Sequence, residues 1–144
     1  MWSYTTEEAE FLAGPRGDLA ARVLAMPADV NPHGDIFGGW IMSLMDTAGM
    51  MTAAKLAQSR VVTVAVTNIE FLCPVKVGDT VCCYTDVSRM GMTSIRLHIE
   101  VWVLRAGRGS RVKVTSAEFT FVALDEDGKP WRFPQADRPS PSSI

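Results

Sequence analysis

Apolar residues fill the stretch from Gly38 to Ala57 on nearly every side of a helix, and this pattern predicts the centre of the fold. The large apolar residues there leave no clear polar stripe: Trp40, Ile41, Met42, Leu44, Met45, Met50, Met51 and Leu56. A helix that is apolar all round is usually buried. We therefore expect a buried helix of roughly 30 Å, at about 1.5 Å per residue.

Strand patterns follow this helix. Residues 60–72 are rich in Val, Ile and Thr, which favour strands, and both faces are largely apolar, so we expect a central strand. Residues 80–89 form the next predicted strand. In residues 93–104 apolar and mostly polar positions alternate, as in a strand with one buried face. The turn Gly107-Arg-Gly109 predicts a hairpin that leads into a last alternating strand over 111–124.

The rest of the chain sets the domain limits. Residues 19–26 form a short apolar run that fits a helix or a strand; we favour a strand, which ends before Pro27. Residues 1–18 are predicted to be an N-terminal arm, 19–130 one domain, and 131–144 a tail rich in Pro and Ser. These elements define an α+β fold in which an antiparallel sheet buries the helix by curling round it.

Composition excludes several classes of function. The net charge is −2 and the basic residues are scattered, which argues against nucleic acid as a partner. No apolar run is long enough for a membrane span, and the first residues lack a signal-peptide pattern, so we expect a cytoplasmic protein. The cysteines are expected to be reduced, and without His or Cys residues at metal-ligand spacing we expect no metal and no cofactor.

One carboxylate interrupts the apolar helix. Asp46 would be costly to bury without a partner. At about 100° per residue it lies on the same side as Gly39 and Ser43. Backbone N–H groups at a helix start are unpaired and carry the positive end of the helix dipole. The pattern therefore predicts a carboxylate that shares a site with the amides of Gly38 and Gly39.

Several short sequence motifs resemble those of one protein family. The Gly-rich word 31–46, together with 60–64, 71–75, 77–83 and 99–102, resembles the hot-dog-fold acyl-CoA thioesterases of the YciA type. The resemblance runs from about residue 19 to 130. It implies a hot-dog fold, a long central helix wrapped by a curved antiparallel sheet. It also implies a homodimer as the minimal active unit, a trimer of such dimers, and active sites at the dimer interface.

The resemblance assigns the catalytic residues. Asp46 matches the catalytic carboxylate, and the amides of Gly38 and Gly39 match the group that polarises the thioester carbonyl. Asp35 stands where some relatives carry a catalytic Asn; it could equally cap the helix or hold the loop. The substrate would be an acyl-CoA, and the products a free acid and CoA.

Substrate binding and mechanism leave alternatives. The substrate-binding candidates are Asn31, Arg60, Thr63, Arg89 and Ser94, although either arginine could be an ordinary surface charge. Asp46 could act as a general base or as a nucleophile that forms a mixed anhydride.

The same fold could also serve a non-catalytic acyl-CoA-binding or sensory module. A hot-dog dehydratase would need a histidine in or near the central helix, and the sequence has none between Gly34 and His98.

Overall fold

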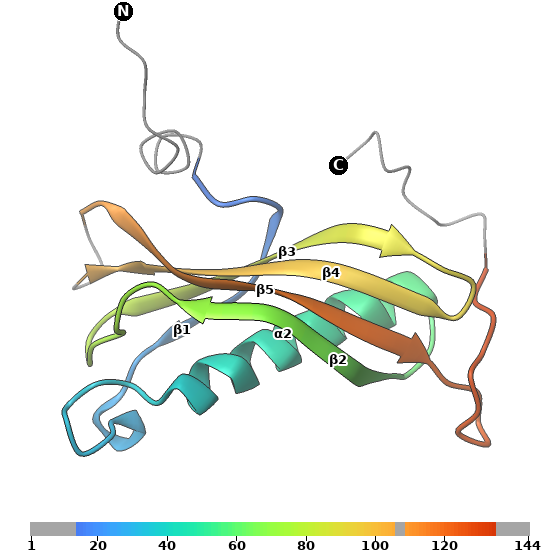
Figure 1. The fold of residues 1–144 in the computed structure, drawn as a ribbon, viewed down its shortest axis with the longest axis horizontal. Coiled ribbons are helices and arrows are strands. Elements are labelled where there is room, and N and C mark those ends of the chain that lie inside the picture. Colours follow the sequence, from blue (N-terminus) through green and yellow to red (C-terminus); the bar gives the residue numbers. More distant parts are fainter. Residues whose placement is uncertain (1–13, 106–108, 135–144) are drawn as a thin grey trace, which may run out of the picture.

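A long helix lies along one face of a curved, five-stranded antiparallel sheet (Figure 1). The structure is a computed structural model, and it describes residues 14–105 and 109–134. The elements are β1 (Asp18–Leu24), the short 3-10 helix η1 (Pro27–Asp29), α2 (Gly38–Ala57), β2 (Val61–Phe71), β3 (Thr80–Met90), β4 (Ser94–Leu104) and β5 (Arg111–Ala123). The strand order is β1-β3-β4-β5-β2. The predicted hot-dog architecture is confirmed.

Helix α2 spans the predicted residues but is not buried on all sides. It starts after Phe37 and ends where Gln58 takes a left-handed conformation with φ 55°. Met45 and the small residues Ala48 and Ala53 face the sheet and are fully buried. The prediction of a helix buried all round was wrong, because the sheet covers one side only. The other side leaves the apolar side chains of Met42, Met50 and Met51 exposed.

Strand β2 lies at one edge of the sheet, so the prediction of a central strand was wrong. It pairs with β5 alone, and Val62 and Val64 are 42% and 54% exposed. Its pairing is also irregular, with register shifts between Thr63 and Ala65 and between Thr67 and Glu70. Asn68, inside the second shift, has φ 57°. An apolar pattern on both faces indicates burial, but it does not say which chain provides the cover.

Strand β4 is the centre of the core. Its alternating residues Ile95, Leu97, Ile99, Val101 and Val103 are all at most 1% exposed, which confirms the predicted buried face. Phe119 and Phe121 on β5 stack beside them, with ring centroids 6.2 Å apart.

Glycine lets α2 approach this layer closely. A Cβ atom on Gly49 would lie 2.7 Å from Ile99 Cδ1 and 2.8 Å from Phe121 Cζ. Carbon atoms that are not bonded prefer about 3.5–4.0 Å, so a side chain at this position cannot be added without movement.

The outer face of the sheet carries a charged network centred on His98. Its Nε2 lies 2.7 Å from Glu100 and its Nδ1 lies 2.9 Å from Glu118. Trp102 Nε1 donates to Glu100 over 2.9 Å, and Lys113 lies 3.7 Å from the same carboxylate. The hydrogen bond to Glu100 raises the pKa of His98; burial opposes this rise and Glu118 adds to it.

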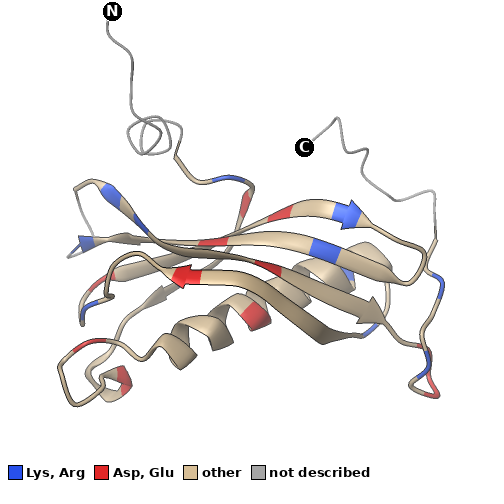
Figure 2. Cartoon of the chain, viewed as in Figure 1, with Lys and Arg blue, Asp and Glu red and all other residues tan. Residues whose placement is uncertain are grey.

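The same network changes Glu100. Burial alone would raise the pKa of Glu100, but hydrogen bonds from His98, Trp102 and the Arg16 backbone outweigh burial and lower it to about 2. The Arg16 side chain also donates to Asp86 over 2.5 Å, which ties the segment before β1 to the outer face. Figure 2 shows acidic and basic positions along the strands, in contrast to the helix, which carries few.

The structure tests some of the predictions for the ends of the chain and for the cysteines, but not all of them. The strand over residues 19–26 is confirmed as β1, and the three cysteines are free as expected. Much of the predicted arm and tail, residues 1–13 and 135–144, lies outside the described residues, as does Gly107 of the hairpin turn. The domain limits therefore stay a prediction. In the part of the chain that is described, no helix is long and apolar enough to cross a membrane.

Candidate active site

Asp46 lies near the middle of α2, on the side that faces away from the sheet core. Its side chain is exposed, and it is the only acidic residue of the helix. The Thr63 hydroxyl on β2 donates a hydrogen bond to Asp46 Oδ1. The sequence placed Thr63 among the substrate-binding residues, and the structure brings it into contact with the candidate catalytic carboxylate. Thr63 therefore fixes the direction in which Asp46 points.

The amides of Gly38 and Gly39 lie at the start of the same helix. The first hydrogen bonds of α2 run from Trp40 N and Ile41 N to Phe37 O, over 3.1 Å and 3.3 Å. Within the described residues neither glycine N–H has a protein partner, as expected at a helix start. Gly39 is exposed, and nothing lies within 4 Å of the position that a Cβ on it would take.

The carboxylate and the amides of one chain are too far apart to act on one carbonyl. Asp46 follows Gly38 by two turns, which corresponds to about 12 Å along the helix axis. A hydrogen bond spans about 3 Å. Within one chain the two groups therefore cannot contact the same ligand atom.

The loop before α2 holds Asn31 and Asp35 in a compact turn. Asn31 Oδ1 accepts from His33 N over 2.9 Å and from Asp35 N over 3.1 Å, so this amide oxygen orders the loop. The Asp35 carboxylate forms an ion pair with Lys76, and its side chain is 31% exposed. Lys76 is a contact that the sequence reasoning missed, because only the register of an isolated bridge places these two residues side by side.

Arg60, Arg89 and Ser94 lie at the far end of the sheet, near the end of α2. Arg89 pairs with Arg96 on β4, Arg96 with Thr120 on β5, and Thr120 with Ala65 on β2. β3, which carries Arg89, is thus three strand spacings from β2, or about 14 Å. Arg89 and β2 therefore lie on opposite sides of the sheet at this end.

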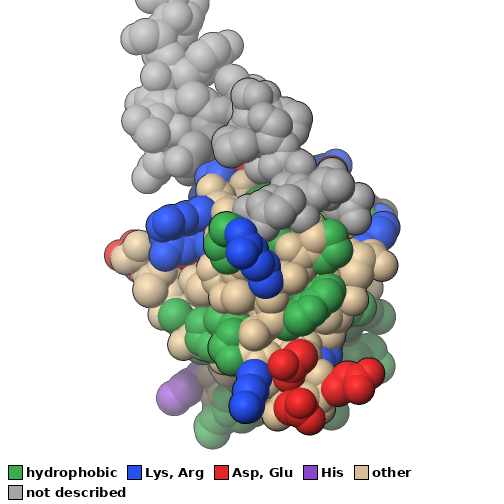
Figure 3. Space-filling view, turned by 90° about the vertical axis from the view of Figure 1, so that its right-hand side faces the viewer, with side chains coloured by type: hydrophobic (Ala, Val, Ile, Leu, Met, Phe, Trp, Pro, Cys, Tyr) green, Lys and Arg blue, Asp and Glu red, His purple; other side chains and the backbone are tan. Residues whose placement is uncertain are grey.

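The Arg60 guanidinium instead lies 3.4 Å from the Asp125 carbonyl. The structure thus does not bring the two arginines together in one chain. Figure 3, which looks at this end, shows basic side chains beside apolar ones.

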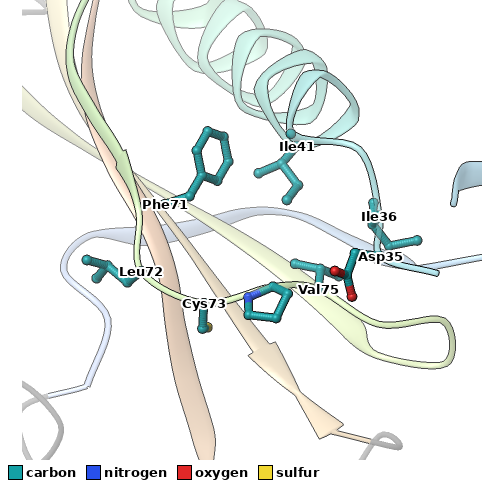
Figure 4. Close-up of a pocket in the computed structure, with 9 residues that line it drawn as sticks. Asp35, Ile36, Ile41, Phe71, Leu72, Cys73 and Val75 are labelled. Carbon is teal, nitrogen blue, oxygen red and sulfur yellow. The ribbon is translucent and has the colours of Figure 1, made fainter. Parts of the chain in front are cut away.

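A groove opens beside the start of α2. Its volume is about 370 Å³, and its lining includes Ile36, Gly38, Ile41, Phe71 and Val75 (Figure 4). We name it the α2 groove. Sequence reasoning missed Phe71 as a site residue; the strand register that carries it to the helix start was the only available signal. Among the described residues no group of His, Cys, Asp and Glu side chains could hold a metal ion.

The family follows from these features together with the comparisons. One long helix packed against a curved, five-stranded antiparallel sheet is the hot-dog fold, and the similar solved structures are hot-dog thioesterases. The thioesterase superfamily matches residues 33–110, and this chain belongs to it.

Individual relatives are close in sequence and structure. The acyl-CoA thioester hydrolase YciA of Salmonella typhimurium is 53% identical over 123 residues, which cover 83% of this chain and 92% of that protein. The hexameric thioesterase y2039 of Yersinia pestis matches with a TM-score of 0.81 and 53% identity, covering 84% of this chain and 98% of that one. HI0827, a hexameric broad-specificity acyl-coenzyme A thioesterase, matches with a TM-score of 0.80 and 48% identity, covering 85% of this chain and 84% of that one.

Proposed function

We propose that this protein hydrolyses acyl-CoA to a free acid and CoA. The observation that carries the proposal is an exposed carboxylate, Asp46, which accepts a hydrogen bond from Thr63 on the open side of α2. Membership of the thioesterase superfamily supports it, as do relatives that are named acyl-CoA thioester hydrolases.

The chemistry needs few groups. In the proposed reaction the amides of Gly38 and Gly39 donate to the thioester oxygen as it gains negative charge, a role typically worth about 3–4 kcal/mol. Asp46 either takes a proton from water, which attacks the carbonyl carbon, or attacks it directly to give an anhydride that water then cleaves. The C–S bond breaks and the electron pair leaves on sulfur. Because a thiol has a pKa near 8.5, the leaving thiolate needs no strong acid.

The active unit is a dimer in this proposal. Asp46 of one chain would meet the Gly38 and Gly39 amides of a second chain, since about 12 Å separates these groups within one helix. The apolar side chains of Met42 and Met50, which are exposed on the side of α2 away from the sheet, offer a place for that second copy. A trimer of such dimers would agree with relatives described as hexameric.

The remaining predicted residues are proposed to order the loop before α2 or to contact CoA. Asn31 orders the loop that leads to the amides, and Asp35 with Lys76 anchors that loop. Arg60, Arg89 and Ser94 are proposed to contact the CoA portion, where separated arginines suit a molecule with phosphates at two distant positions. A cytoplasmic location stays part of the proposal.

Thiol release from acyl-CoA tests the reaction. We expect turnover by the wild type, and a loss of about 10²–10⁴-fold in Asp46→Asn, which keeps the shape of the side chain but removes its charge. Asp127→Asn makes the same chemical change in an exposed loop and is the control. A loss of only a few-fold in Asp46→Asn, with the oligomer intact, would overturn the role of Asp46. Acyl-CoA binding without thiol release would favour a binding module.

A mixing experiment tests the shared site. Gly38→Pro removes the N–H at the first helical position, where Pro is tolerated, and the extended Phe37 before it, with φ −56° and ψ 135°, accepts a following Pro. Gly38→Pro and Asp46→Asn should each be inactive alone. Unfolded and refolded together, they should recover about a quarter of wild-type activity, because half of the dimers then contain one intact site. No recovery in mixed oligomers would show that one chain supplies both groups.

A further inference from the structure

The α2 groove is apolar at its base and open at its mouth. Ile36, Ile41 and Val75 are 5%, 2% and 0% exposed and form the base. Phe71, at the end of β2, is 46% exposed and forms one wall. In Figure 4 the Phe71 ring and the Ile41 side chain face each other beside the start of α2, whereas Leu72 points away from them.

Polar groups in this lining are few and compensated. Asp35 is neutralised by its ion pair with Lys76. Cys73 donates to the Lys113 carbonyl over 3.4 Å, and burial raises the pKa of its thiol, which keeps it uncharged. Apart from the Gly38 N–H at its edge, the described part of this groove offers a charged or strongly polar ligand no unpaired side chain. An apolar chain would find a matching surface.

The groove touches the amide that the proposed reaction uses. A Cβ atom on Gly38 would lie 3.4–3.8 Å from three atoms of the Phe71 ring, so the ring packs directly beside the helix start. A carbonyl held by the Gly38 N–H would therefore carry its substituent past Phe71. Of the two substituents on a thioester carbonyl, the acyl chain is the apolar one.

We propose that the α2 groove holds the acyl chain and that Phe71 sets the chain length that fits. This inference rests on the proposed function. The chain that supplies the amides would also supply the acyl-binding wall, while the second chain supplies Asp46. A volume of about 370 Å³ is near the lower end of small-ligand pockets, which span about 300–1,000 Å³. Short and medium acyl chains would fill the groove, and longer ones would extend into solvent.

The test is the dependence of kcat/KM on acyl length, from acetyl-CoA to long-chain acyl-CoA. In the wild type each added methylene should raise kcat/KM by up to about fourfold until the groove is full, after which the values stay level. Phe71→Trp should make the values level off at a shorter chain. Phe71→Ala should lower kcat/KM about tenfold for chains that reach the ring and change it less than about twofold for acetyl-CoA.

Two controls make the result specific. Leu24→Ala truncates another apolar side chain, 52% exposed, on the opposite edge strand, and should keep the wild-type profile. Inhibition by free CoA, which has no acyl chain, should be equal in all variants. Because Phe71 is half exposed, its variants are expected to fold, and light scattering verifies their assembly. Should Phe71→Ala fail to assemble, Phe71→Trp alone decides the question.

Two results would overturn the inference while leaving the proposed function intact. One is an unchanged length profile in the Phe71 variants. The other is an equal loss for every acyl-CoA, including acetyl-CoA, which would place Phe71 at the carbonyl instead of the chain. Absence of thiol release by the wild type from every acyl-CoA would count against the proposed function itself.

Discussion

Gly49 is the point at which α2 and the sheet core come closest, and replacing it measures how tightly they pack. In Gly49→Ala the new methyl group would lie 2.7 Å from Ile99 Cδ1 and 2.8 Å from Phe121 Cζ. Both neighbours are fully buried, so neither can move into solvent. Ala is favoured over Gly in a helix by about 1 kcal/mol, whereas overpacking costs about 1–3 kcal/mol. We expect Gly49→Ala to lower the free energy of unfolding by up to about 2 kcal/mol.

A double-mutant cycle isolates the contact. Ile99→Val removes the Cδ1 atom and alone should cost about 0.5–1.5 kcal/mol. In the Gly49→Ala background it also relieves the clash, so its cost should fall by about 1 kcal/mol. Gly39→Ala, where nothing lies within 4 Å of the added methyl group, is the control in the same helix and should not destabilise.

Urea unfolding followed by tryptophan fluorescence gives these values. Protein concentration must be fixed, because assembly contributes to stability, and the slope of the transition must stay constant across variants. A gain of about 1 kcal/mol in Gly49→Ala, with no coupling to Ile99→Val, would show that only helix propensity acts and that the close packing is not real.

Further predictions concern the site, the charged network and the segment before β1. Thr63→Val should lower kcat about tenfold with little change in KM, because it removes the hydrogen bond to the carboxylate, and Thr63→Ser should restore the rate; equal kcat in all three would exclude this positioning role. His98 has a raised pKa in the fold, so its stabilisation is present below about pH 6.5, its unfolded value, and is lost as pH rises through the folded value. Unfolding of His98→Gln across pH should lack this loss, and a profile identical to the wild type would contradict the network. Gly17 has φ +93° and a Cβ there would lie 2.2 Å from the Thr85 carbonyl oxygen; Gly17→Ala should therefore lower the thermal midpoint by several degrees, corresponding to more than about 1 kcal/mol, and an unchanged midpoint would contradict the close crossing.

Local patterns were sufficient to predict the elements. The helix from Gly38 to Ala57 was predicted with its observed limits, since a glycine pair opens it and Gln58-Ser59-Arg60 follows it. The alternation in β4 was equally clear, because one face of that strand packs on the core. These features depend on residues close together in the sequence, and their physical causes act over the same short range.

Contacts between residues that are far apart in the chain could not be predicted from the sequence. β2 was expected at the centre because its residues are apolar, but edge and centre differ only in which strands lie alongside. Two site contacts depend on how β2 is placed against the helix: the hydrogen bond between Thr63 and Asp46, and the packing of Phe71 against Gly38. Two register shifts in β2 change this placement. The roles of the predicted site residues themselves stay predictions.

The irregular edge strand also limits how the protein can associate. A straight, apolar edge offers hydrogen bonds to an unlimited series of further strands and invites fibres. In β2 the register shifts at Thr63–Ala65 and Thr67–Glu70, the second of which contains Asn68 in a left-handed conformation, interrupt the row of backbone groups. A neighbouring strand can join only along a short stretch before the bends turn it aside. The apolar edge strand can thus pair with one further chain without starting an open-ended series of paired strands.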